Sequence, residues 1–255
     1  MTDTITYELP LNERVRVLLR LDFLAGQFTH FAKGLSVWDS RAAVDTLLDA
    51  ITLVDRADLR GELLKEMERQ VAFLGPLERV PGVDVARLRN ILDEFDSVAD
   101  RIKMQTGPLA PNLRADQFLL EIQNRIGLPA GICDFDLPLF HAWLEKAIQV
   151  RQQDLNRWAE ELVPVWCAAE LMLRIIRGTG ETVAKLAEKG VFQINFTADQ
   201  QCQMVRVILP ANANCYPTMS GDRHRVTIRF MSLHSEGGTV QTQEDIPFHL
   251  VCCAL

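Results

Sequence analysis

The stretch NERVRVLLRLDFL (residues 12–24) predicts a helix that is apolar around most of its circumference and yet carries Arg16 and Arg20 one turn apart. Apolar residues flank the two arginines on both sides, so the charged stripe is narrow. A mostly buried helix keeps such a stripe when it reaches water, when carboxylates of its own chain pair with it, or when it binds the carboxylates of a partner. The pattern by itself leaves these three roles open.

The helical periodicity continues from this stretch to about residue 188. Ser40 is the expected N-cap of a second helix over 40–54, Asp58 begins a third, and Asp84 caps a fourth. In the fourth helix the apolar positions from Val85 to Ile102 alternate in steps of three and four residues, a pattern that packs helices nearly antiparallel.

Two further helical segments follow, over 115–126 and 138–178, and a loop rich in Gly and Pro (127–138) separates them. Pro164 lies inside the second segment, and its missing amide predicts a bend there rather than a break.

The last quarter of the chain alternates apolar and polar residues with a period of two, which is typical of strands with one buried face. The alternating segments are VFQINFT (191–197), QMVRVIL (203–209), HRVTIRFMSL (224–233) and DIPFHLVCC (245–253). Turn-forming segments lie between them, at 197–201, 211–214 and 235–238.

The change of period predicts an α+β fold that is mostly α, with an antiparallel helical domain over 11–188 and a small antiparallel β-domain over 189–255. We expect about five strands in a single sheet. The segment TITYEL (4–9) is also strand-like and would pair onto that sheet.

A second basic stripe lies on the segment 224–233. Because side chains alternate along a strand, Arg225 and Arg229 share one face, and Arg223 lies just upstream. The two side chains on that face stand about 13 Å apart. A solvated outer face of an antiparallel sheet explains such a pattern as well as a binding surface does.

Composition excludes several classes of protein. The chain has 255 residues, is 48% apolar and carries a formal charge of -7, so it builds a sizeable core and repels nucleic acid and anionic membranes on average. No signal peptide begins it and no stretch is apolar enough to cross a bilayer, which favours a cytoplasmic location without membrane insertion.

The six cysteines do not have the spacing of a metal site. We therefore expect neither a metal nor another cofactor. Cys252 and Cys253 are adjacent, and in a reduced cytosol they are best explained as strand residues on opposite faces of a sheet.

Signals for catalysis are weak. RGTGETVAKL (177–186) lacks the Lys-Ser/Thr ending of a phosphate-binding loop and follows a helix instead of a strand. His141 lies near Asp134 and Asp136, which is the basis of an alternative reading as a hydrolase. No nucleophile motif accompanies it, so we predict no catalytic residues and no small-molecule substrate.

Five long segments and the terminal CC resemble, in the same order, the ZapD family of bacterial cell-division proteins. They are YELPLNERVRVLLRLDFL (7–24), RGELLKEMERQ (60–70), VPGVD (80–84), GICDFDLPLFHAWL (131–144) and SGDRHRVTIRFM (220–231). The resemblance spans nearly the whole chain.

The resemblance implies a cytoplasmic, non-enzymatic homodimer with a helical domain and a β-domain. Family members bind the C-terminal tail of the tubulin-like GTPase FtsZ and bundle its filaments at the Z-ring of the division septum. The alternative of the same kind is another adaptor that binds an acidic peptide.

The resemblance also implies a basic groove for the FtsZ tail. The residues that match it are Arg16, Arg20, His141, Arg225 and Arg229, with Arg114, Arg125 and Arg223 as neighbours. At Gln117 other members can carry a basic residue, so that contact is in doubt.

Guanidinium groups suit such a tail because they bind carboxylates bidentately. A groove between the first helix and the sheet would have Phe23 or Phe31 as its apolar lining. A nucleic-acid-binding sheet would instead alternate aromatic residues with its arginines, whereas Thr227 and Met231 occupy those positions.

Overall fold

The computed structural model describes residues 3–55, 58–105, 107–197, 201–233 and 238–254. The chain divides into two compact units, one formed by Met1–Val17 with Leu173–Leu255 and the other by Leu18–Met172. We call them the β-unit and the helical unit. The predicted α+β class, mostly α, is confirmed. The domain boundary at residues 188 and 189 stays a prediction.

The helices follow one another along the chain between β1 (Thr4–Pro10) and β2 (Thr182–Ala187). They are α1 (Glu13–Ala32), α2 (Val37–Val54), α3 (Leu59–Leu74), the 3-10 helix η1 (Gly75–Arg79), α4 (Val85–Met104), α5 (Pro111–Ala115), α6 (Gln117–Ile126), α7 (Pro138–Leu144), α8 (Ile148–Ala159) and α9 (Val163–Gly178).

Local capping chemistry sets several helix starts. The Asp84 carboxylate accepts a hydrogen bond from the Arg87 amide, as expected for the N-cap of α4. The expectation that Ser40 caps α2 is wrong, because Ser36 is the cap and forms a capping box with Asp39. Ser40 lies one turn inside the helix and is buried.

The predicted bend at Pro164 is also wrong, because the helical stretch 138–178 is broken into α7, α8 and α9. Pro164 lies in the first turn of α9, where a backbone amide has no partner within the helix. The proline therefore starts a helix instead of bending one.

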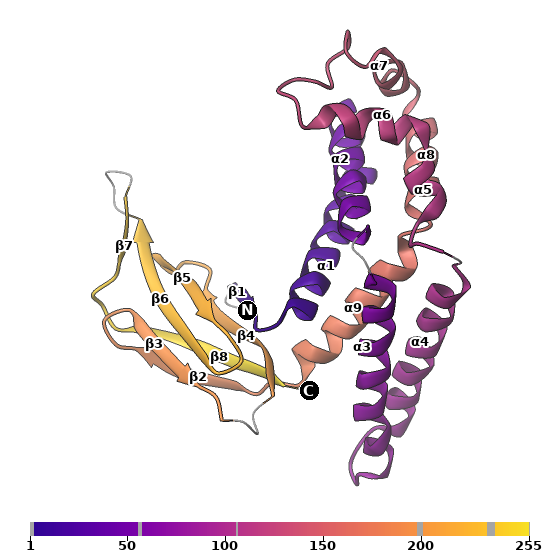
Figure 1. Cartoon of the computed structure of the whole chain (residues 1–255). Coiled ribbons are helices and arrows are strands. Elements are labelled where there is room, and N and C mark those ends of the chain that lie inside the picture. The colour runs from indigo at the N-terminus through magenta and orange to yellow at the C-terminus, as the bar shows by residue number, and fades with distance from the viewer. Residues whose placement is uncertain (1–2, 56–57, 106, 198–200, 234–237, 255) are drawn as a thin grey trace. The chain divides into compact units, whose positions relative to one another are not determined.

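Within the helical unit, α3 and α4 lie side by side and are joined by η1 (Figure 1). A cluster of aromatic rings forms elsewhere in its core, with Phe118 stacked on Trp158 at 5.3 Å and Phe140 stacked on Trp143 at 5.9 Å. The two indole nitrogens of this cluster donate hydrogen bonds to carboxylates: Trp158 donates to Asp116 and Trp143 donates to Asp154, both at 3.0 Å.

The β-unit contains two four-stranded antiparallel sheets instead of the single sheet of about five strands that the period of two predicts. One has the order β1-β4-β8-β2, and in the other β3-β6-β5 is extended by β7 beside β6. The strands are β1 (Thr4–Pro10), β2 (Thr182–Ala187), β3 (Val191–Asn195), β4 (Cys202–Pro210), β5 (Cys215–Gly221), β6 (Arg225–Leu233), β7 (Thr239–Gln241) and β8 (Ile246–Ala254).

Strands β2, β5 and β7 lie outside the segments expected from alternation, and β2 falls within the stretch that the periodicity predicts to be helical. The turns predicted at 197–201 and 235–238 lie largely outside the described residues.

The two sheets pack face to face through aromatic and branched side chains (Figure 1). The ring of Phe248 on β8 lies 5.1 Å from Phe230 on β6 and 5.3 Å from Phe192 on β3. Cys252 and Cys253 follow on β8, and no cysteine of the chain forms a disulfide.

Candidate partner-binding site

The arginines of α1 lie on its solvent-exposed face, while Val15, Leu18 and Leu21 are buried. The Arg16 Nε lies 3.2 Å from Glu13 Oε2, an ion pair at the i, i+3 spacing that local helix geometry favours. Among the described residues, no ion pair involves Arg20. Of the three possible roles of the stripe, Arg16 pairs with a carboxylate of its own chain, and Arg20 is exposed to water.

An exposed aromatic ring accompanies Arg20. Phe23 lies three residues further along α1, on the same face, and is 68% exposed. Phe31 is half-buried and contacts the ring of His30 at 5.2 Å. Of the two phenylalanines expected as apolar lining, Phe23 is therefore the one that is open to a partner.

Strand β6 shows the expected alternation. Val226, Ile228 and Phe230 are buried between the sheets, and Arg225 and Arg229 are exposed on the outer face. This confirms that the two arginines share one surface.

The cross-strand neighbours of the β6 arginines have neutral side chains. On β3, Arg225 and Arg229 pair with Asn195 and Val191, and on β5, Arg229 pairs with Thr218. The Arg225 guanidinium donates to the Gln193 amide oxygen at 2.6 Å, and no ion pair involves Arg229 among the described residues. The positive charge on this face is thus not cancelled by its strand neighbours.

A cavity of about 490 Å³ joins the first turn of α1 to the turn that precedes β6. Arg14 lines it from the helix, and Arg223 and His224 line it from the turn. None of the described lining residues is acidic. Asn12, also in its wall, caps α1 by accepting a hydrogen bond from the Val15 amide at 2.9 Å.

Two features of the cavity favour an anion: it contains cationic side chains, and it lies at the N-terminus of a long helix, where the helix dipole is positive. The adjacent Asp222 carboxylate accepts hydrogen bonds from the backbone amides of His224 and Arg225, and these bonds lower the pKa of Asp222. That carboxylate thereby helps to shape the turn.

Arg14 was not among the residues expected from the sequence. It lies outside the Arg16–Arg20 stripe on the helix wheel, and only the fold brings it to the same cavity as Arg223. The signal that was available is local: Arg14 follows Asn12 by two residues, in the first turn of a helix.

The remaining predicted cations have carboxylate partners inside the helical unit. Arg114 pairs with Asp55, and His141 Nδ1 lies 3.1 Å from Asp134 Oδ1. Arg125 Nη1 lies 3.7 Å from Asp136 Oδ1. These three side chains are the least available to a partner.

Arg41, which sequence reasoning missed, holds the loop that precedes α7, the helix of His141. It donates to the Ile132 carbonyl at 3.1 Å, approaches Asp134 at 3.7 Å and stacks over the Phe140 ring at 5.0 Å. The cluster of charges near His141 thus has a structural explanation.

The alternative hydrolase site is only half assembled. Asp134 orients His141, but Asp136 instead accepts a hydrogen bond from the Cys133 thiol at 3.3 Å. No hydroxyl or thiol of the described residues is hydrogen-bonded to His141, so a nucleophile poised beside a base is not seen there. The described residues also contain no cluster of three or more metal-ligating side chains.

The predicted site residues are divided between the two units. Arg20, Arg114 and His141 belong to the helical unit, whereas Arg16 and the arginines of the segment 223–229 belong to the β-unit. The convergence of all of them in one groove stays a prediction, as does the effect of Gln117, which is exposed at the start of α6.

Comparison with known proteins identifies relatives along the whole chain. The family model described as ZapD, cell division protein, matches residues 19–229. A cell division protein ZapD of Chromobacterium violaceum is 36% identical over 98% of this chain and 99% of its own length. The ZapD of Methylococcus capsulatus is also 36% identical, over the full length of both chains, and that of Coxiella burnetii is 34% identical over 99% of this chain.

None of the helices in the described part of the chain combines the length and apolar character needed to cross a bilayer.

Proposed function

The chain belongs to the ZapD family of cell division proteins, and from this premise we propose that it binds the C-terminal tail of FtsZ through a basic groove. As a homodimer it cross-links FtsZ filaments into bundles and stabilises the Z-ring at mid-cell. Membership in the family supports the role in cell division, and the partner and its binding mode are our inference.

The observation that carries the proposal is the cavity whose described wall contains Arg14, Arg223 and His224. An acidic tail needs such a local concentration of positive charge, because the whole chain carries a charge of -7 and repels an acidic partner at long range. The helix N-terminus and two guanidinium groups there suit a carboxylate.

Arg20 on α1 and Arg229 on β6 are two further basic residues on the surface of their elements. Both are exposed and neither forms an ion pair with a described residue, so binding a carboxylate costs no internal pair. Phe23 beside Arg20 supplies an apolar contact for a tail that carries both charged and apolar side chains.

The affinity of one tail for one groove is expected to be modest. Each exposed ion pair contributes about 0–1 kcal/mol, and ordering the tail offsets part of that sum. A symmetric dimer presents two grooves and a filament presents many tails, so the effective concentration makes cross-linking firm but reversible.

The experiment that tests the proposal is the sedimentation of FtsZ assembled with GTP, using intact FtsZ and FtsZ without its C-terminal tail. We expect the wild-type protein to bundle only the intact filaments. Arg20→Glu and Arg223→Glu should each abolish bundling while the protein remains folded by circular dichroism.

The matched control is Arg101→Glu on α4, which reverses an exposed arginine that forms no ion pair with a described residue and lies outside the proposed groove. Bundling that persists with tail-less FtsZ, or that Arg101→Glu reduces as strongly as Arg20→Glu does, would contradict the proposal. Sedimentation equilibrium tests the dimer separately.

The alternative of another acidic-peptide adaptor makes a different prediction. Such a protein would bind unrelated acidic peptides of equal charge as tightly as the FtsZ tail. A scrambled tail peptide of the same composition therefore separates the two functions.

A further inference from the structure

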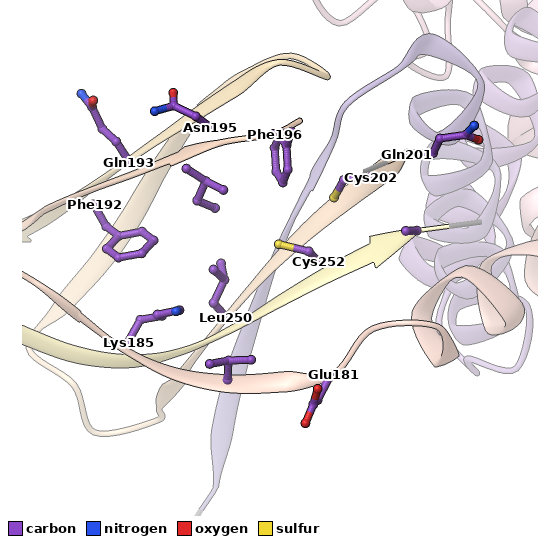
Figure 2. A pocket seen from close by; sticks show the side chains of 13 residues that line it. Glu181, Lys185, Phe192, Gln193, Asn195, Phe196, Gln201, Cys202, Leu250 and Cys252 are labelled. Carbon is purple, nitrogen blue, oxygen red and sulfur yellow. The ribbon is translucent and has the colours of Figure 1, made fainter. Parts of the chain in front are cut away.

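A second cavity of the β-unit contains two thiols. It has a volume of about 670 Å³ and is lined by residues of β2 and β8 from one sheet and of β3 from the other (Figure 2). Its wall is mostly apolar, with Phe192, Phe196 and Leu250 among the lining residues. Cys202 and Cys252 lie next to each other in this wall, and Lys185 reaches toward the same space (Figure 2).

A β-bulge places Cys202 in the cavity. On β4, Val205 pairs with Cys252 and Met204 with Cys253, but Cys202 pairs with Ala254, which leaves Gln203 as an extra residue. Because side chains alternate along a strand, a regular β4 would turn Cys202 to the face opposite Cys252. The bulge instead brings both thiols to the inner face, on neighbouring hydrogen-bonded strands.

The two thiols differ in chemical state. A hydrogen bond from Cys202 stabilises the thiolate of Cys252, and the Lys185 ammonium adds to this effect, so the pKa of Cys252 is lowered although burial opposes it. The same hydrogen bond and burial raise the pKa of Cys202. Cys202 is buried, with its sulfur 3.4 Å from the Met204 carbonyl, whereas Cys252 is only half-buried.

Cys253 provides an internal contrast. It is the next residue on β8, points to the opposite face of the sheet and is completely buried. Burial raises the pKa of Cys253 to about 11. Adjacent cysteines of one strand thus lie in opposite environments, one open to a cavity and one sealed.

From the cavity, the bulge and the paired thiols, we propose that Cys252 and Cys202 form a thiol modification site that reacts with small disulfides and closes into a disulfide between β4 and β8. The ligand class is a low-molecular-weight disulfide of the glutathione type. No part of this inference depends on FtsZ.

The reaction proceeds in two exchanges. The Cys252 thiolate attacks one sulfur of the small disulfide, whose S–S bond breaks and releases one small thiolate, which is protonated by water. This leaves a mixed disulfide on Cys252. Cys202 then loses its proton to water and attacks the Cys252 sulfur, which releases the second small thiol.

The balance is two protein thiols oxidised to one disulfide and one small disulfide reduced to two thiols. Formation of the mixed disulfide removes the Cys252 thiolate whose charge disfavours ionisation of Cys202. The first exchange therefore activates Cys202 for the second.

Mass spectrometry of the intact protein after exposure to oxidised glutathione tests the site. We expect the wild-type protein to lose two hydrogen atoms and to yield, after digestion without reductant, a peptide pair joined through Cys202 and Cys252. Cys202→Ser should stop at the mixed disulfide on Cys252, and Cys252→Ser should give neither product at these two positions.

Alkylation rates add an independent readout. At pH 7 we expect iodoacetamide to modify Cys252 about fivefold faster than Cys215, because a larger thiolate fraction outweighs its lower intrinsic nucleophilicity. Cys215 is the matched control, since it is also a half-buried strand cysteine and burial raises its pKa. Lys185→Gln should shift the pH profile of Cys252 alkylation upward and leave that of Cys215 unchanged.

Alkylation of Cys252 no faster than that of Cys215, or a disulfide that joins any other pair of cysteines, would overturn the proposal. Because a serine variant can fail to fold, Cys202→Ala provides a second test and is expected to give the same mixed disulfide. Its circular dichroism spectrum should match that of the wild type.

Discussion

The outer face of β6 and the region around His141, where α6 and α7 meet the loop between them, both carry basic residues, yet their surroundings are opposite. Beside Arg229 the register places Val191 and Thr218, whereas His141 contacts Asp134 and Arg125 contacts Asp136. A carboxylate arriving from outside meets an unpaired guanidinium in the first region and an existing ion pair in the second. The availability of a cation is thus decided by its neighbours in the fold and not by its presence in a basic motif.

The same contrast occurs within one helix. Arg16 and Arg20 are one turn apart on α1, but only Arg16 has an ion pair, with Glu13. Unpaired cations should therefore dominate binding, and paired cations should contribute mainly to stability.

The largest expected effect is on tail binding when both unpaired arginines are reversed. Arg20→Glu combined with Arg229→Glu replaces two attractions by two repulsions, about 1.4 kcal/mol each, so we expect about a 100-fold weaker affinity for the FtsZ tail peptide. Fluorescence anisotropy of a labelled tail peptide measures it. A loss of less than about threefold would show that the two unpaired cations are not the binding surface.

The next largest effect concerns stability, at the most strongly paired cations of the β-unit. The Glu8 carboxylate accepts two hydrogen bonds from Arg177, at 3.0 and 2.9 Å, and lies 3.0 Å from Arg206. Glu8→Gln leaves two partly buried guanidinium groups without their carboxylate, and we expect it to lower the free energy of unfolding by about 2 kcal/mol.

Urea denaturation measures that change, and the same preparation should bind the tail peptide as tightly as the wild type. If folded Glu8→Gln protein binds the tail more weakly, this would contradict the expectation that paired cations contribute to stability and unpaired cations to binding.

A smaller effect distinguishes two neighbours on β6. Arg229→Ala should weaken tail binding about threefold, and Arg225→Ala should weaken it less, because Arg225 already donates to Gln193. Raising the salt concentration should reduce the difference between wild type and Arg229→Ala, since exposed pairs are screened. Titrations at low and high ionic strength measure both trends.

The smallest effect on binding is expected where the cations are paired. Arg114→Ala and His141→Ala should each change tail affinity by less than about twofold and lower stability by about 0.5–1 kcal/mol. Thermal denaturation and anisotropy on the same samples give both values. A large binding defect without loss of stability would mean that the tail displaces Asp55 or Asp134 from its partner.

Much of the helical unit follows from local sequence signals. Asp84 caps α4 as its side chain predicts, whereas Ser36 and Ser40 are both suitable caps and only the reciprocal bond with Asp39 selects Ser36. Pro164 is compatible with a bend and with a first helical turn, and the sequence signal at this position does not distinguish the two.

The β-unit was harder to predict because pairing, and not periodicity, creates some of its strands. β5 contains Pro217 and little alternation, and it is a strand because β6 offers it a hydrogen-bonding edge. A period of two also does not indicate whether the strands form one sheet or two.

For the candidate site, the sequence identified the exposed arginines but not their partners. The Glu13–Arg16 pair has a spacing that sequence inspection can detect. The pairing of Arg114 with Asp55 joins residues far apart in the chain, and so does the cavity shared by Arg14 and Arg223. Only tertiary structure reveals such contacts.

The pairing of β1 with β4 has a consequence for synthesis on the ribosome. Thr4 pairs with Pro210 and Pro10 with Met204, so the first strand emerges long before its partner is made. The helical unit, Leu18–Met172, is translated in between. Because this unit is one continuous segment, all contacts within it join residues that have been synthesised before β4. We therefore expect nascent chains to acquire the helical unit first, with an unpaired N-terminal strand exposed to chaperones until translation is nearly complete.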